Sequence, residues 1–154
     1  MRNMKAQSAM EYLMTYGWAI LIVIIVAAAL FALGVFNPAT YTQSTATGFT
    51  GFQIPSGGWQ FTTGGVLTLQ LKNMAGANIN ITNIQATYAG TSGTNTTASN
   101  PIGPGSAYTE KVTIAGVTPA TGASYSVDVV VSYTNLDTGL AFTSSGKVTG
   151  TVSA

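Results

Sequence analysis

The hydrophobic and polar positions divide the chain into two sharply different parts. From Trp18 to Phe36 the chain has 19 consecutive residues that are apolar or glycine. At about 1.5 Å per residue, such a run forms a helix roughly 28 Å long, close to the ~30 Å hydrocarbon core of a bilayer. Because no face of this helix is polar, it is not a surface helix of a soluble protein. We therefore expect a transmembrane or filament-core helix over 7–36.

The residues at the end of this run predict where the helix stops. Gly34 favours helix termination, and Asn37-Pro38 stops a helix because proline cannot continue it. Several of the next residues are threonines, which favour extended chain. We therefore expect a connector over 37–47 and a head domain over 48–154.

In the head domain, apolar and polar residues alternate as they do in half-buried strands. Over 66–72, Leu67, Leu69 and Leu71 occupy every second position. A change in the phase of the alternation predicts a β-bulge near Thr82-Asn83. The expected strands are Phe49–Ile54, Trp59–Thr62, Val66–Lys72, Ile79–Tyr88, Tyr108–Ile114, Tyr125–Tyr133 and Leu140–Val152.

Two segments between these strands carry turn and loop residues. Gly90 to Gly105 is polar and contains proline, which predicts a loop, and Asp137 to Gly139 predicts a hairpin turn. Short strands at this spacing are typical of an antiparallel β-sandwich. The expected fold class is therefore α+β, with a long N-terminal apolar α-helix followed by an antiparallel β-sandwich head domain. We expect its core, rather than a ligand platform, to contain Trp59, Phe61, Tyr125, Tyr133 and Phe142.

Charged and chemically reactive residues are scarce. Only 6% of the residues are charged, the formal net charge is +1, and the chain has no His and no Cys. The sequence therefore offers no imidazole or thiolate ligand for a metal, no Ser-His-Asp or Cys-His arrangement, and no basic region for nucleic acid. Glu110 and Asp128 as a glycosidase-type carboxylate pair are disfavoured, since isolated strand charges are usually solvated. We expect neither an enzyme nor a cofactor.

Serine, threonine and asparagine offer candidate sites for glycans. The abundant Ser and Thr fit a plain strand surface, and O-glycan acceptors or a hydroxyl-rich adhesive exterior are the alternatives. Two N-glycosylation sequons are present, Asn80-Ile81-Thr82 and Asn95-Thr96-Thr97. Asn95 lies in the predicted loop and is the better candidate. Asn80 lies in a predicted strand, so it can accept a glycan only if its side chain faces outward.

The residues before the apolar run indicate its orientation. Arg2 and Lys5 predict that the N-terminal end stays in the cytoplasm and that the C-terminal side is outside. A secretory signal peptide usually has a shorter apolar core, although Ala27-Ala28-Ala29 keeps that alternative open. Glu11 argues against it, because a carboxylate in a membrane helix is costly and usually marks function. Alternatively, Glu11 lies at the interface, where the helix dipole favours an anion.

The segment Lys5-Ala6-Gln7-Ser8-Ala9-Met10-Glu11, followed by Leu13 and the long apolar run, resembles the class III signal peptide of archaeal type IV pilins. Members of that family often have Gly at the position of Ala6. The resemblance implies that a membrane-embedded prepilin peptidase cuts between Ala6 and Gln7 and removes a leader over 1–6. Glu11 then becomes the fifth residue of the mature chain, where pilins carry a glutamate.

The resemblance also implies a place in the cell and a set of partners. The precursor is expected in the membrane, and the pilus assembly machinery is expected to build it into a homopolymeric, helical adhesion filament at the cell surface. The new α-amine of Gln7 lies about one helical turn from Glu11, so it would neutralise the Glu11 of a neighbouring subunit. The alternatives are a monomeric membrane-anchored extracellular binding domain, which retains the leader, and an archaellin-type filament subunit.

Overall fold

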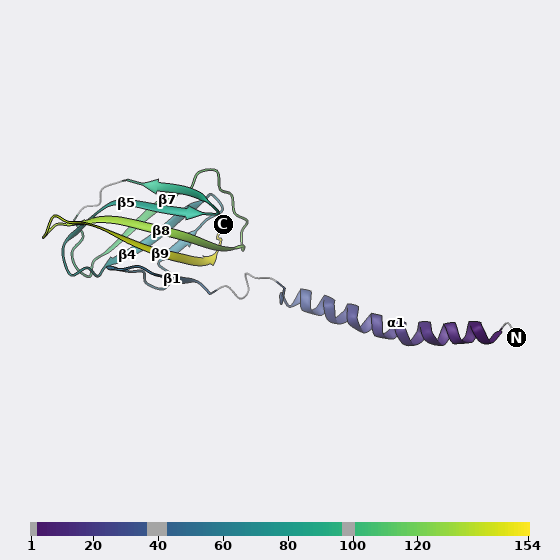
Figure 1. The fold of residues 1–154 in the computed structure, drawn as a ribbon. Coiled ribbons are helices and arrows are strands. Elements are labelled where there is room, and N and C mark those ends of the chain that lie inside the picture. Colours follow the sequence, from purple (N-terminus) through teal and green to yellow (C-terminus); the bar gives the residue numbers. More distant parts are fainter. Residues whose placement is uncertain (1–2, 37–42, 97–100) are drawn as a thin grey trace. The chain divides into compact units, whose positions relative to one another are not determined.

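The computed structural model describes residues 3–36, 43–96 and 101–154, and the chain forms two compact units (Figure 1). The first unit contains one helix, α1 (Asn3–Ala32). The second unit is the head domain and contains the strands. The arrangement of a long apolar helix followed by antiparallel sheets confirms the predicted fold class.

Helix α1 ends in a Schellman motif, in which the chain reverses through a residue in the left-handed conformation. The amide of Val35 donates to the carbonyl of Leu30 and that of Gly34 to Phe31, both at 3.1 Å, and Gly34 has a φ of 70°. The helix therefore ends at Ala32, before the predicted end at Phe36, and its backbone begins at Asn3, within the expected leader. The predicted boundary at Gln7 is the expected cleavage site and stays a prediction. Apolar character continues beyond Ala32, but the glycine ends the helical backbone.

The head domain contains two antiparallel sheets (Figure 1). The strand order of the larger sheet is β1-β9-β8-β5-β6. In the smaller sheet β4 is central, with β2 and β3 on one side and β7 on the other. The strands are β1 (Thr45–Thr47), β2 (Phe52–Gln53), β3 (Trp59–Phe61), β4 (Val66–Asn73), β5 (Ile79–Tyr88), β6 (Thr91–Asn95), β7 (Ala107–Thr113), β8 (Ser124–Asn135) and β9 (Ala141–Thr151).

The inner faces of the two sheets form one hydrophobic core. Along β4, Leu67, Leu69 and Leu71 are at most 1% exposed, and the residues between them are half-buried, as the alternation predicted. Across the domain, the ring of Phe61 on β3 lies 5.1 Å from that of Tyr125 on β8. This contact joins the two layers, and the predicted β-sandwich is present.

The aromatic residues expected in the core are not all there. Phe61, Tyr125 and Tyr133 are buried, and Trp59 is half-buried. Phe142 is 43% exposed and stacks on Tyr133 with a ring separation of 5.7 Å, so its prediction as a core residue is wrong. The reason is its position beside the β8–β9 turn, where the apolar side chains before it in the sequence are also exposed.

The longer strands follow their predicted patterns closely. Strand β5 has the predicted bounds, and its register with β8 shifts between Ile81 and Asn83, which confirms the predicted bulge. The predicted turn at Asp137 to Gly139 is also present, with the amide of Gly139 donating to the carbonyl of Asn135 at 2.8 Å.

Two short strands lie where none was predicted. Strand β6 falls within the expected loop from Gly90 to Gly105, and β1 falls within the expected connector over 37–47. The single buried residue of β6 is Gly93, which gives no hydropathy signal, and β1 is too short to show alternation. Pairing with β5 and β9, respectively, holds these strands in place. The rest of the connector, 37–42, lies outside the described residues.

Small residues allow the two sheets to approach each other at both sides of the sandwich. On one side, a Cβ added to Gly93 of β6 would lie 2.2 Å from the carbonyl oxygen of Thr113 on β7. On the other, a Cβ added to Gly146 of β9 would lie 2.4 Å from the ring of Phe49. The backbone of each glycine therefore lies close against its neighbour, and a side chain at either position would push that neighbour away.

We expect Gly146→Ala to destabilise the head domain by about 1–3 kcal/mol, because the added methyl group must displace the Phe49 ring. In a Phe49→Ala background the same change should cost much less. Gly64→Ala is a matched control, because its nearest neighbour is the hydroxyl of Thr62 at 3.8 Å. Urea unfolding of the four variants of the cycle measures the coupling. An equal cost of Gly146→Ala in both backgrounds would contradict this account.

Candidate functional site

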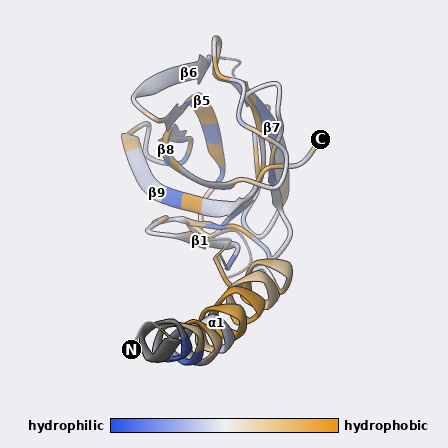
Figure 2. Ribbon diagram, turned by 90° about the vertical axis from the view of Figure 1, so that its right-hand side faces the viewer, coloured by the Kyte–Doolittle hydropathy of each residue, from blue (hydrophilic) through white to orange (hydrophobic). Residues whose placement is uncertain are grey.

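The exposed helix α1 is the first candidate site. Its segment Gln7–Ala32 is 26 residues long and apolar enough to cross a membrane. At about 1.5 Å per residue it extends roughly 39 Å, which exceeds the ~30 Å hydrocarbon core. Its apolar side chains are exposed around the helix, with Trp18 at 68%, and Figure 2 shows the hydrophobic colour along most of its length. This composition fits a membrane anchor or a signal sequence.

The first turns of α1 differ from the rest because they carry polar side chains. The hydroxyl of Thr15 donates to the carbonyl of Glu11 at 2.9 Å, and the rings of Tyr12 and Tyr16 lie 4.1 Å apart. At about 100° per residue these side chains fall on one side of the helix, and Met10 falls on the other. We call this side the polar stripe: Ser8, Glu11, Tyr12, Thr15 and Tyr16.

The structure places the predicted processing and assembly residues on the same helix. Lys5, Ala6 and Gln7 lie in its first turns, so the expected cleavage bond between Ala6 and Gln7 is part of the helical backbone. Gln7 and Glu11 are exposed and four residues apart, which puts them on the same face about 6 Å apart along the axis. The structure thus brings the two predicted assembly residues together within one subunit.

The two sequons have different environments. Asn80 lies on β5 between the buried residues Ile79 and Ile81, so it faces outward from the five-stranded sheet. Asn95 ends β6 instead of lying in a loop, so that prediction is wrong. Its side-chain amide donates to the carboxylate of Glu110 and to the carbonyl of Lys111. A glycan on Asn95 would be attached to the same nitrogen that makes these bonds.

A polar cluster of Asn95, Tyr108 and Glu110 connects the two sheets where β6 and β7 meet. The hydroxyl of Tyr108 donates to the carboxylate of Glu110 at 2.5 Å, and this bond, with burial and the Glu110 charge, raises the pKa of Tyr108 to about 12. The sequence alone did not predict this cluster. The sequence did contain a signal in the alternation of strand faces, because Tyr108 and Glu110 lie on the same face of β7 as the buried Val112.

The acidic side chains of the head domain do not form a catalytic pair. Glu110 belongs to the β6–β7 cluster, whereas Asp128 lies on β8 and forms an ion pair of 3.3 Å with Lys147. Within 3–36, 43–96 and 101–154, no group of three or more potential metal ligands occurs.

Comparison with known proteins adds no assignment. No protein-family model matches this chain, and no curated protein matches it significantly. The N-terminal segment and the geometry of the two units are therefore the basis for inferring a function.

We expect Tyr108 to titrate near pH 12, because losing its proton would place two negative charges side by side. Since the pKa is raised in the folded state, this pair stabilises the fold below pH 10 and loses its effect between pH 10 and about 12. Glu110→Gln should bring the pKa back toward 10.0, and Asp137→Asn, in the β8–β9 turn, should not. NMR of ¹³C-labelled tyrosine rings during a pH titration measures both. Titration of wild-type Tyr108 near 10.0 would contradict the hydrogen bond.

Proposed function

We propose that this chain is the structural subunit of an extracellular filament of the archaeal type IV pilus class, polymerised through α1. The observation that carries the proposal is an exposed helix that is apolar on all faces beyond its first turns, in the same chain as a separately folded β-sandwich. Such a helix is stable only when lipid or other apolar helices cover it. Lipid covers it in the precursor, and other copies of the helix cover it in the filament.

Covering the apolar side chains of α1 releases enough free energy to keep helices associated outside the membrane. A large aliphatic side chain gains about 1.5–3 kcal/mol when it leaves water. Burying five of the exposed apolar side chains of α1 therefore supplies on the order of 10 kcal/mol. Because the same side chains are also covered in the bilayer, transfer from lipid to filament gains much less and requires the assembly machinery.

Removal of the leader completes the change from membrane protein to filament subunit. Arg2 and Lys5 each contribute about 1 kcal/mol of attraction to an anionic cytoplasmic surface. Cleavage between Ala6 and Gln7, which the pilin resemblance implies, removes both cations. It also creates a positively charged α-amine next to the polar stripe.

In the filament, the polar stripe sets the register between neighbouring helices. An isolated carboxylate in a helix core carries a desolvation penalty of several kcal/mol, and pairing with a cation offsets it. The α-amine of Gln7 in one copy pairs with Glu11 of the next. The hydroxyls of Tyr12 and Tyr16 lie on the same stripe and are hydrogen-bond donors for that carboxylate. A buried polar group of this kind selects one alignment of otherwise apolar helices.

The head domain forms the outer wall of the filament in this proposal. Its outward strand positions carry Thr and Ser, which keep it soluble with few charges. Adhesion is the function that the pilin resemblance implies for such a wall. N- or O-linked glycans would be added there, and Asn80 and Asn95 are the candidate N-linked acceptors.

A membrane-anchored extracellular binding domain is the competing function. The length of Gln7–Ala32 supports it, because one copy of this segment spans a bilayer without any partner. In that case the leader stays on the chain, and Glu11 lies in the headgroup region, where it needs no partner.

Protein sheared from the surface of the source cells is expected to begin at Gln7 and to sediment as high-molecular-weight material. Intact mass and N-terminal sequencing measure the first property, and ultracentrifugation measures the second. A chain that begins near Met1 and is found only in the membrane fraction would identify the anchored domain and end the filament proposal.

Glu11→Gln is expected to leave cleavage intact and to reduce filament yield at least tenfold, because the amide has nearly the same shape but no charge to pair with the α-amine. Glu11→Asp is the matched control, since it keeps the charge and should assemble better than Glu11→Gln. Processing is read from the chain mass, and assembly from the sheared fraction. Normal filaments from Glu11→Gln would refute the charge pairing.

A further inference from the structure

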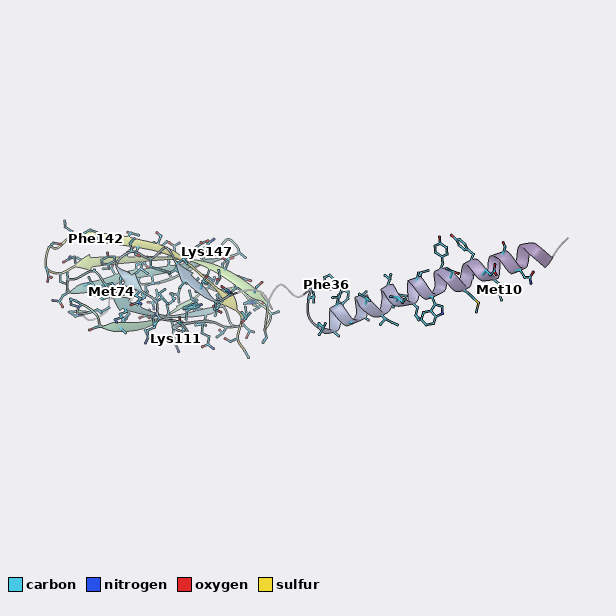
Figure 3. All side chains as sticks on the ribbon, turned by 90° about the horizontal axis from the view of Figure 1, so that it is seen from below. Met10, Phe36, Met74, Lys111, Phe142 and Lys147 are labelled. Carbon is cyan, nitrogen blue, oxygen red and sulfur yellow. The ribbon has the colours of Figure 1, made fainter. Side chains whose placement is uncertain are left out.

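The three lysines of the head domain are distributed unequally over its two faces. Lys147 lies on the five-stranded sheet and pairs with Asp128. Lys72 on β4 and Lys111 on β7 form no ion pair with any residue in the described part of the chain. Figure 3 shows Lys111 and Lys147 on opposite faces of the domain.

Both unpaired lysines occupy outward positions on the four-stranded sheet. Leu71 on β4 and Val112 on β7 point into the core, so the adjacent residues Lys72 and Lys111 point out. Glu110 points inward to the β6–β7 cluster. Among the described residues, the outer face of this sheet therefore carries two positive charges and no acidic side chain.

The register of β4 and β7 sets the spacing between these two charges. Lys72 is paired with Ala107, and Lys111 is paired with Thr68, four residue pairs further along the ladder. Four residues of a strand correspond to about 13 Å. The pair between them is Gln70 and Thr109, whose side chains are neutral and able to form hydrogen bonds.

A shallow groove of about 230 Å³ opens on the same face beside this central pair. One wall is a turn formed by two glycines, and Gly57 has no side chain to fill the space. The carbonyl oxygen of Gly58 accepts a hydrogen bond from the backbone amide of Gln70 at 2.6 Å. The other lining residues are Trp59, Gln60, Thr68, Gln70 and Thr109. The groove thus offers side-chain amides and hydroxyls, which both donate and accept hydrogen bonds, and its lining contains no charge.

We infer that this face binds an acidic polysaccharide, with sugar hydroxyls in the groove and carboxylate or sulfate groups on Lys72 and Lys111. Amides and hydroxyls match the mixed donors and acceptors of a sugar ring, and the flanking lysines match anionic groups spaced along the chain. These contacts lie on a partly exposed, open surface, so one head domain binds weakly and in a salt-dependent way.

Nucleic acid and membranes fit this face less well. A single-stranded nucleic acid requires aromatic side chains on which bases stack. The indole of Trp59 donates instead to the carbonyl of Thr149 on β9, at 3.1 Å. A lipid surface is usually recognised by a cluster of 4–8 basic residues, and this face has two.

The inference holds for a single subunit and does not depend on the proposed filament. In a filament, repetition of the face along the wall would convert weak single contacts into strong multivalent attachment. The binding measurement therefore uses detergent-solubilised full-length chain. A negative result there would leave the processing and assembly tests of the filament unaffected.

Binding is measured with polygalacturonate and with its methyl ester, which has the same sugar backbone without the charge. The wild-type chain should bind polygalacturonate at least tenfold more tightly than the ester. The double variant Lys72→Gln/Lys111→Gln should lose at least fivefold of this binding. Lys147→Gln removes the same charge from the opposite face and should bind as the wild type does. Absence of wild-type binding, or an equal loss in Lys147→Gln, would overturn the inference.

A second pair of measurements distinguishes a sugar groove from a surface that attracts any polyanion. Gln70→Ala and Thr109→Ala alter only outward-facing side chains, and each should weaken polygalacturonate binding about threefold. Neither should change the weak binding of single-stranded DNA. Equal effects on both polymers, or no effect on either, would show a non-specific basic face and overturn the assignment. Far-ultraviolet circular dichroism of each variant checks that the fold is intact.

Discussion

A helix that is apolar on every face has to be covered by something other than water, and this constraint governs the rest of the molecule. The exposed side chains of α1 supply a large gain in free energy to any lipid or helix that covers them. That gain is non-directional, so it does not select one alignment of neighbouring helices. Specific alignment requires a polar group at a defined height, and Glu11 is the charged side chain of the polar stripe.

The head domain meets the same requirement in the opposite way, because it covers its own apolar residues. Its two sheets enclose one core. Gly93 and Gly146 allow close contacts with their neighbours, and the Asn95–Glu110 hydrogen bond joins the layers where β6 meets β7. The domain is thereby independent of what covers the helix, as the proposed passage from membrane to filament requires.

Because the head domain has few charged side chains, the position of each one affects the charge of the face on which it lies. Asp128 and Lys147 neutralise each other on one face, and Glu110 is turned inward to hydrogen-bond with Tyr108 and Asn95. Lys72 and Lys111 are left together on the other face. A chain with a net charge of only +1 thus presents one face with a positive potential. Composition alone does not reveal this asymmetry, since it depends on which strand face each residue occupies.

The sequence by itself determined every feature that depends on local periodicity. The uninterrupted apolar run specified α1, and the alternation of Leu67, Leu69 and Leu71 specified β4. The phase change near Thr82-Asn83 specified the bulge in β5, because a shift in the buried positions requires an extra residue. These signals are strong because burial repeats along one segment and needs no knowledge of its partner.

Only the tertiary structure decided the features that depend on which segments become neighbours. Strands β1 and β6 have no apolar pattern and form because β9 and β5 offer free edges for pairing. Asn95 became part of a hydrogen-bonded cluster because β6 lies beside β7, and Phe142 stayed exposed because it lies beside a hairpin turn. The grouping of Lys72 with Lys111 likewise follows from the β4–β7 register. Pairing between strands sets the first, second and last of these outcomes, and the apolar pattern of a single strand does not contain that information.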